Sequence, residues 1–271
     1  MASPTFDGAA TATASTNATA TATLTSTAAN DVIVVIAYNE ANVAPGAAVA
    51  SVTASGLSFV QRSVSNGSSK GSLEVWWAPA ALPLTAKAIA VSWVPNYDDA
   101  CVIAWAINGC NIASPWDPNV GLPVKGSSSS GAPSLSGVNT TNANDLLINL
   151  AANMTASLSE PSGWTGRDQV GNGGGINTAN LYSASLSVSS PQSGLSAAWS
   201  GLFTGNAGEN IIDALTAGAA ASSKSFFFGP FLGLAPIPLG PAAAIGASAL
   251  RLARKNPTLR RRDIARSLLG L

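Results

Sequence analysis

Apolar and polar positions along the chain follow two patterns, strict alternation and short continuous runs. Residues 10–27, ATATASTNATATATLTST, alternate Thr with Ala, and a period of two predicts extended chain, with a flexible linker as the alternative. Residues 31–38 and 145–151 are nearly continuous apolar runs, which indicates central strands covered on both faces. Turn sequences with Asn-Gly, Gly-Gly or Pro recur about every 10 residues, as in antiparallel sandwiches. The pattern predicts an all-β, jelly-roll-like β-sandwich.

The two apolar runs also begin alike, which indicates an internal repeat. AANDVIVVIAY at residues 28–38 is echoed 114 positions later by NANDLLINLAA at residues 142–152. Further similar pairs follow in the same order, LSFVQRSVSNG with GWTGRDQVGNG and CVIAWAING with NIIDALTAG, at offsets that drift as loop insertions would make them. We therefore expect an internal duplication of a unit of about six strands, over residues 9–125 and 126–222, in one joint sandwich.

Composition narrows the chemistry that the chain can perform. With 271 residues, 46% of them hydrophobic and 10% charged, the chain can bury a large core, and we do not expect it to be disordered. Histidine is absent, which excludes catalytic triads and zinc sites built on His. One extended strand would hold Cys101 and Cys110 about 30 Å apart, too far for a disulfide, whereas a turn at Asn108-Gly109 would bring them closer. We expect buried or free thiols.

Several stretches together resemble a known type of module. The Thr-rich strand, NDVIVVIAY, GSLEVWWAPAA and, most specifically, NIASPWDPNVGLP at residues 111–123 are similar to a jelly-roll module of phage virion proteins and of bacterial and archaeal surface proteins. The resemblance covers residues 9–218. It implies a virion-surface or extracellular role and trimers as the closed assembly, and it transfers no active-site residue.

Acidic turn residues are the candidates for a metal site. Asp98 and Asp99 in YDDA, and Asp117 with Asn119 in SPWDPN, are the best clusters for calcium, which needs roughly six to eight oxygen ligands. No D-x-D-x-D-G run is present, so the plainer interpretation is solvated turn acids, with Asp117 capping a Pro turn. We expect no cofactor.

Aromatic residues are the candidates for a ligand surface. Trp76 and Trp77 are neighbours in an expected strand, so one ring should face the core and the other should face outward, toward a glycan or another subunit. Trp116 beside Asp117 is a second candidate. Tryptophans at repeated strand positions are instead expected in the core: Trp93, Trp105 and Trp199.

The sequence displays no catalytic pair of carboxylates. Glu74 and Asp213 lie inside apolar strands but are 139 positions apart, and no motif brings them together. Acid/base chemistry, including the cleavage of glycans, relies on such a positioned pair. We therefore expect a protein that is not an enzyme.

The C-terminal segment differs from the rest in charge and in pattern. Residues 1–223 carry five basic and twelve acidic side chains, a net charge of −7, whereas residues 224–271 carry eight basic and one acidic, a net charge of +7. Residues 225–250 are uncharged and apolar, but the prolines at positions 230, 236, 238 and 241 argue against a membrane-spanning helix. We expect an extended apolar strap over residues 225–241, which must be covered by something because exposed it would promote aggregation.

Two short helices are expected after the strap, one over residues 242–254 and one that Asn256 caps, with Pro257 at its first position. The last helix separates apolar from basic side chains, which suits a groove on a neighbouring subunit or an anionic membrane surface. We do not expect nucleic acid, because the arginines offer no base-reading groups; folding back on the chain's own sandwich is a further alternative. The residues expected to mediate assembly or anchoring are Phe226, Phe227, Phe228, Phe231, Leu232, Arg260, Arg261, Arg262, Arg266, Leu268 and Leu269.

Taken together, these features predict a non-enzymatic structural protein of the virion surface, a capsid decoration or fibre-type subunit. The basic tail would dock on the acidic body of a neighbouring subunit in a homo-oligomer, with other virion proteins as further partners. The N-terminal sequence MASPTFDGAATATAST shows no secretory signal, which favours this interpretation. The alternative is a cell-surface adhesin or lectin-like protein that binds a host glycan and is anchored at a membrane by the tail.

Overall fold

The computed structural model describes residues 3–16, 18–40, 48–67, 71–94, 99–128, 131–153, 157–171, 179–202 and 208–218. Every regular element in these ranges is a β-strand, and none of these residues lies in a helix, which confirms the predicted all-β class. The strands belong to one compact unit, Met1–Ala221. The expected strap, the tail helices and all eleven assembly residues lie outside the described residues, as does Asp98.

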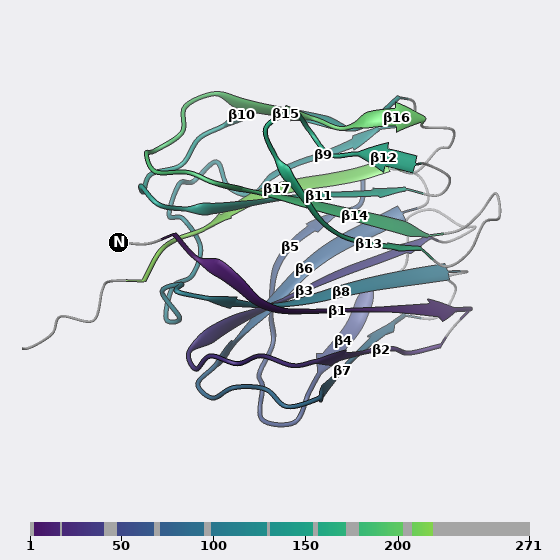
Figure 1. The fold of residues 1–271 in the computed structure, drawn as a ribbon. Helices are drawn as coiled ribbons and strands as arrows, with labels where there is room; N and C mark the ends of the chain where they lie inside the picture. Colours follow the sequence, from purple (N-terminus) through teal and green to yellow (C-terminus); the bar gives the residue numbers. More distant parts are fainter. Residues whose placement is uncertain are drawn as a thin grey trace, which may run out of the picture. The chain divides into compact units, whose positions relative to one another are not determined.

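The first eight strands form two antiparallel sheets (Figure 1). The larger sheet has the order β1-β8-β3-β6-β5 and the smaller one the order β2-β7-β4. The bounds are β1 (Thr5–Ser15), β2 (Ala20–Leu24), β3 (Asp31–Glu40), β4 (Val49–Thr53), β5 (Val60–Ser65), β6 (Gly71–Ala80), β7 (Lys87–Trp93) and β8 (Asp99–Asn108). The alternating Thr/Ala stretch thus contributes to β1 and β2 and is not a flexible linker.

The remaining strands form a second large sheet, with the order β9-β17-β11-β14-β13, and two small sheets, β10-β15 and β12-β16. The bounds are β9 (Val124–Ser128), β10 (Ser134–Val138), β11 (Leu146–Asn153), β12 (Ser157–Ser159), β13 (Thr165–Gly171), β14 (Asn180–Ser187), β15 (Leu195–Ala198), β16 (Ser200–Leu202) and β17 (Gly208–Leu215). The described residues thus hold seventeen strands, and the expected total of about twelve was too low. The strands of three or four residues, β12, β15 and β16, are too short to show a period.

The strand order is the same in both halves of the body. Counted within each half, both large sheets run first, eighth, third, sixth, fifth. The smaller layers also agree, because the second and fourth strands of each half both pair with the seventh. In the second half the seventh position is divided into β15 and β16, with Trp199 between them.

The sheets stack in four layers with three apolar cores between them (Figure 1). One outer core lies between the small and large sheets of the first half, and the other lies between those of the second half. The central core takes side chains from both large sheets, from β3, β6 and β8 on one side and β11, β14 and β17 on the other. The two halves thus share the central core.

The continuous apolar run of β3 follows from this layering. β3 pairs with β6 on one side and with β8 on the other, and all ten of its residues are buried. Alternate side chains enter different cores, with Ile33 and Val35 in the outer core and Val34 and Ile36 in the central core. Each such buried Ile or Val contributes about 1.5–3 kcal/mol of transfer free energy. The predicted burial of both faces is therefore confirmed, and β11 behaves in the same way.

Both cysteines are free and buried, as expected. Cys101 lies in β8 and its Sγ contacts the Ala179 carbonyl oxygen at 3.0 Å, in the other half of the body. Cys110 follows the end of β8, and burial raises the pKa of its thiol to about 12. Neither cysteine forms a disulfide.

Candidate functional site

The adjacent tryptophans of β6 do point in opposite directions, but both directions lead to a core. Trp76 packs against the outer core of the first half and Trp77 against the central core, and both rings are partly buried. The indole Nε1 of Trp76 donates to Glu74 Oε2 at 3.0 Å. An outward-facing ring was expected because the sequence does not reveal that a second layer covers each face of this sheet.

Glu74 is a structural anchor rather than one member of an acid/base pair. It is buried, and its carboxylate accepts hydrogen bonds from the Val49 backbone N–H at 2.7 Å and from Gln61 Nε2 at 2.7 Å, in addition to Trp76. These donors come from β4, β5 and β6, so the carboxylate ties the edge of the large sheet to the small one. Asp213, the other carboxylate considered from the sequence, has a different partner.

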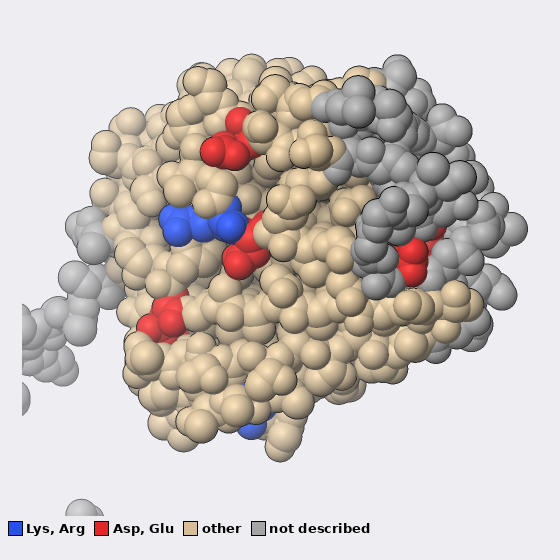
Figure 2. Space-filling view, turned by 45° about the vertical axis from the view of Figure 1, so that its right-hand side comes forward, with Lys and Arg blue, Asp and Glu red and all other residues tan. Residues whose placement is uncertain are grey.

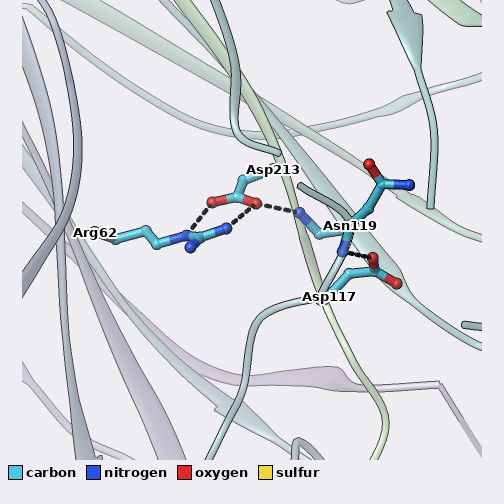
Figure 3. A network of polar contacts seen from close by, with 5 residues as sticks. Arg62, Asp117, Asn119 and Asp213 are labelled. Atoms are coloured by element: carbon cyan, nitrogen blue, oxygen red, sulfur yellow. Dashed lines mark hydrogen bonds and ion pairs between the residues drawn. The ribbon is translucent and has the colours of Figure 1, made fainter. Parts of the chain in front are cut away.

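A salt bridge joins Arg62 of β5 to Asp213 of β17 (Figure 3). The guanidinium donates from Nε to Oδ2 at 2.8 Å and from Nη2 to Oδ1 at 3.1 Å, a bidentate geometry. Asp213 is fully buried, and its Oδ1 also accepts the Ala214 N–H at 2.9 Å. Burial raises the pKa of the Asp213 carboxyl, and the Arg62 guanidinium opposes that shift. Arg62 also lies over the Trp116 ring, 5.0 Å from its centroid.

Asp117 organises the loop that precedes β11. Its Oδ1 accepts the Asn119 N–H at 2.8 Å (Figure 3). Its Oδ2 accepts the backbone N–H groups of Thr141 and Asn142, both at 2.9 Å. Asp117 is 2% exposed, so it is not the solvated turn acid that the sequence favoured. The cap on a Pro-containing turn is present, and it reaches a second loop as well. Sequence reasoning could not see that second loop because it lies 24 positions further along.

A second carboxyl group, Asp145, lies directly beside this cap. Burial and the neighbouring Asp117 raise the pKa of Asp145 to about 8. For Asp117 itself burial opposes ionisation, but hydrogen bonds from Asn119, Asn142 and Thr141 lower the pKa overall. At neutral pH the pair therefore consists of one carboxylate and one protonated acid.

The first half contains a matching acid pair that sequence reasoning missed. Asp7 accepts the backbone N–H groups of Thr27 and Ala28 at 2.6 and 2.8 Å, and these hydrogen bonds lower its pKa. Asp31 beside it has its pKa raised by burial. The signal in the sequence was the dipeptide Phe6-Asp7, which is an aromatic residue followed by Asp, like Trp116-Asp117, upstream of an Asn-Asp pair.

A metal site finds little support in the described body. Asp99 begins β8, where it is paired in register with Ser15 and Glu40. Both carboxylate oxygens of Asp117 accept hydrogen bonds from backbone N–H groups. Among the described residues no three His, Cys, Asp or Glu side chains gather in a way that could hold an ion.

A small groove lies on the second half, beside β13, and is lined by Leu158, Glu160, Gly166, Arg167, Asp168, Gln169, Tyr182, Ser183 and Trp199. Its volume of about 160 Å³ is below the range of roughly 300–1,000 Å³ usual for ligand pockets. Two of the three charged side chains that line it are used by the fold, since Asp168 Oδ2 accepts Trp105 Nε1 at 2.7 Å and Arg167 Nε donates to Ser185 Oγ at 2.6 Å. Figure 2 shows the charged side chains of one face as a few separate groups on a largely uncharged surface.

The tryptophans at repeated strand positions behave as predicted. Trp105 is fully buried, Trp93 and Trp199 are 6% and 5% exposed, and Trp116 is also buried at 8%. Among the described residues, none forms a helix of the length and hydropathy that crossing a bilayer requires.

Comparisons with models of known protein families, with curated proteins and with solved structures found no match for this chain. The resemblance to virion and surface modules therefore stays a prediction. What the geometry offers is a body whose aromatic and acidic candidates hold strands, loops and layers together.

Proposed function

We propose that this chain is a non-enzymatic structural subunit of a virion surface, a capsid decoration or fibre-type protein whose body is a duplicated jelly roll attached through the C-terminal tail. The observation that carries the proposal is the repeated eight-position strand order, with the large layer first-eighth-third-sixth and the small layer second-seventh-fourth. Eight antiparallel strands in two such layers are the make-up of jelly rolls, a fold used in viral capsids and lectins. The fifth strand departs from that scheme, since β5 and β13 pair with the sixth strand rather than with the fourth.

Local geometry supports the duplication. Asn30 and Asn144 both adopt positive φ, 63° and 62°, directly before the acid that precedes or opens the third strand. The caps of Asp7 and Asp117 both hold the loop just upstream of these asparagines. On this basis we set the boundary between the two units at Ala113 and Ser114, about a dozen residues before the boundary expected from the sequence.

The position of the chain ends supports attachment through the tail. The Gly218 N–H donates to the Gly109 carbonyl at 2.7 Å, and Gly109 lies against Pro4. The N-terminus and the last described residues of the body are therefore at the same end (Figure 1). The described body stops at this end, and the residues expected to mediate attachment follow it in the chain.

The proposal is tested by measuring the solution mass of the full chain and of a version that ends at Ala221, using light scattering after gel filtration. We expect a defined oligomer for the full chain and a folded monomer for the shortened one, with unchanged thermal unfolding of the body. A matched control replaces Arg260, Arg261 and Arg262 by Gln, which keeps the tail length and removes charge. Recovery of the shortened protein in assembled particles at full occupancy would contradict attachment through the tail.

The lectin-like alternative shares the same fold argument, because jelly rolls also serve as lectins. A monomeric full chain that floats with anionic liposomes and binds a glycan array would favour it. Loss of glycan binding in Trp76→Ala or Trp77→Ala, in variants that still fold as judged by circular dichroism, would assign the binding to these rings.

A further inference from the structure

Strand registers give residue-by-residue equivalences between the two large sheets. Val32 of β3 faces Ile107 of β8, and Leu146 of β11 faces Leu215 of β17, so Ile107 and Leu215 are equivalent. Two positions earlier, Trp105 is therefore equivalent to Asp213. Phe6 pairs with Ile107 and Trp116 pairs with Leu215, so these two aromatic residues are equivalent as well.

Arg62 and Arg167 are also equivalent, and each contacts an aromatic ring of the opposite half. Each lies in the fifth strand of its half at a register irregularity, Arg62 between Gln61 and Ser63 and Arg167 between Gly166 and Gln169. Arg62 crosses to the second half and lies 5.0 Å from the Trp116 ring centroid. Arg167 crosses to the first half and lies 4.3 Å from the Phe6 ring centroid.

The contacts between strands of the two halves are reciprocal in the same way. β1 contacts β13 as β9 contacts β5, β8 contacts β13 as β17 contacts β5, and β8 contacts β14 as β17 contacts β6. In each case the first contact becomes the second when the two halves trade places. Such reciprocity defines an isologous interface, the type that closes a twofold symmetric dimer.

The chain crosses between the halves next to the place where the two eighth strands meet. Cys110 pairs with Ala217 in an antiparallel bridge, and the Asn111 N–H donates to the Thr216 carbonyl at 3.2 Å. The residues that follow, Ala113 and Ser114, are exposed. A single exposed turn is thus the covalent link between two complete sets of strands.

We infer that the central-core face of each half is a self-complementary docking surface whose occupant is the other half, so that the two halves form a fused twofold dimer. This inference does not rest on the proposed virion role, because it uses only contacts within the described body. The halves hold each other through the central apolar core and the exchanged arginine contacts, and the turn at residues 113–114 is not needed to keep them together.

The test is to insert a protease recognition sequence between Ala113 and Ser114 of the full chain, cleave it, and compare the mass in solution before and after cleavage. We expect the cleaved protein to keep the mass of the uncleaved one at micromolar concentration. The inserted but uncleaved protein is the control for the insertion itself. Separation of the two pieces after cleavage, or precipitation of either piece while the control stays soluble, would overturn the inference.

A second variant tests whether the exchanged contacts carry the association. In the cleaved protein, Arg62→Ala combined with Arg167→Ala should dissociate at a clearly lower urea concentration than the cleaved protein with both arginines. Should the double Ala variant fail to fold, the Lys variants keep the charge but lose the planar fork, and a smaller shift in the same direction is expected. An unchanged midpoint in both variants would contradict the assignment.

Discussion

The two arginine sites between the large sheets occupy equivalent positions and differ in chemistry. Arg62 forms a bidentate ion pair with Asp213, which is fully buried, whereas Arg167 donates to Ser185 Oγ and is itself exposed. Both guanidinium groups lie over an aromatic ring of the opposite half. Both sites have an arginine that reaches an aromatic ring of the other half. The Arg62 site differs because it also neutralises the buried carboxylate of Asp213. The two sites thus share their geometry, although their residue types differ.

The largest effect is expected from Arg62→Ala. The substitution leaves the Asp213 carboxylate buried without its counter-charge, which typically costs about 3–5 kcal/mol. The free energy of unfolding, measured by urea denaturation, should fall by that amount. Adding Asp213→Asn to Arg62→Ala should recover part of the loss, because the buried group is then neutral.

Arg167→Ala is the matched comparison for Arg62→Ala. Arg167 is exposed, so its cation–π contact and its hydrogen bond should together contribute only about 1 kcal/mol. Equal losses from the two arginine variants would break the comparison, since they would mean that the buried carboxylate makes no difference.

A pH effect of comparable size is expected at the acid pair of the second half. In the unfolded chain Asp145 should ionise near pH 4, whereas burial and Asp117 raise its folded pKa to about 8. Below pH 4 the residue is protonated in both states; between pH 4 and 8 rising pH favours the unfolded state; above pH 8 the difference is constant. The stability contribution is lost at about 1.4 kcal/mol for each pH unit within this window.

Asp145→Asn mimics the protonated acid and should abolish that loss. The variant should match the wild type near pH 4 and exceed its unfolding free energy at pH 8, as measured by urea denaturation at both pH values. Asp31→Asn in the first half should give a smaller difference, because Asn108 Nδ2 donates to Asp31 Oδ1 at 2.9 Å and opposes the raised pKa. A pH-independent difference between Asp145→Asn and the wild type would contradict the assigned protonation.

Much of the fold was predictable, because its signals are local. Alternation in β2 places Ala20, Ala22 and Leu24 in the core, and the unbroken apolar run of β3 reports burial on two faces. The Asn-Asp echo located the equivalent third strands. The number of strands was underestimated, since the shortest ones carry no readable period.

The candidate site was less predictable, because its contacts are long-range. Arg62 and Asp213 are 151 positions apart, and no local pattern links a basic residue in an edge strand to an acid in a distant apolar one. The rings of Trp76 and Trp77 were expected to include one facing outward, and what turned that face into an interior was the second sheet packed on it. A sequence reveals which strand faces are apolar but not which layer covers them.

The third largest losses of stability are expected from removing the two loop caps, Asp117 in the second half and Asp7 in the first. Asp117→Ala removes the acceptor for backbone donors from two loops and should cost about 2 kcal/mol. Asp7→Ala removes the equivalent cap, which is partly exposed, and should cost about 1 kcal/mol. Thermal unfolding of both variants measures the difference, and a larger loss from Asp7→Ala would reverse the ranking.

The smallest effect is expected when each of the two equivalent aromatic residues is replaced by the aromatic residue found at the other site, Trp116 by Phe and Phe6 by Trp. Trp116→Phe keeps an aromatic face for Arg62 and removes an indole N–H that is buried without a hydrogen-bond partner, so the unfolding free energy should change by less than about 1 kcal/mol. Phe6→Trp should be tolerated similarly, because Phe6 is only partly buried. Phe6→Leu is the control, since it keeps apolar volume but loses the face for Arg167. If Leu is tolerated at position 6 as well as Trp is, the ring is packing alone, and the equivalence between the two sites rests on backbone geometry without the crossing cation.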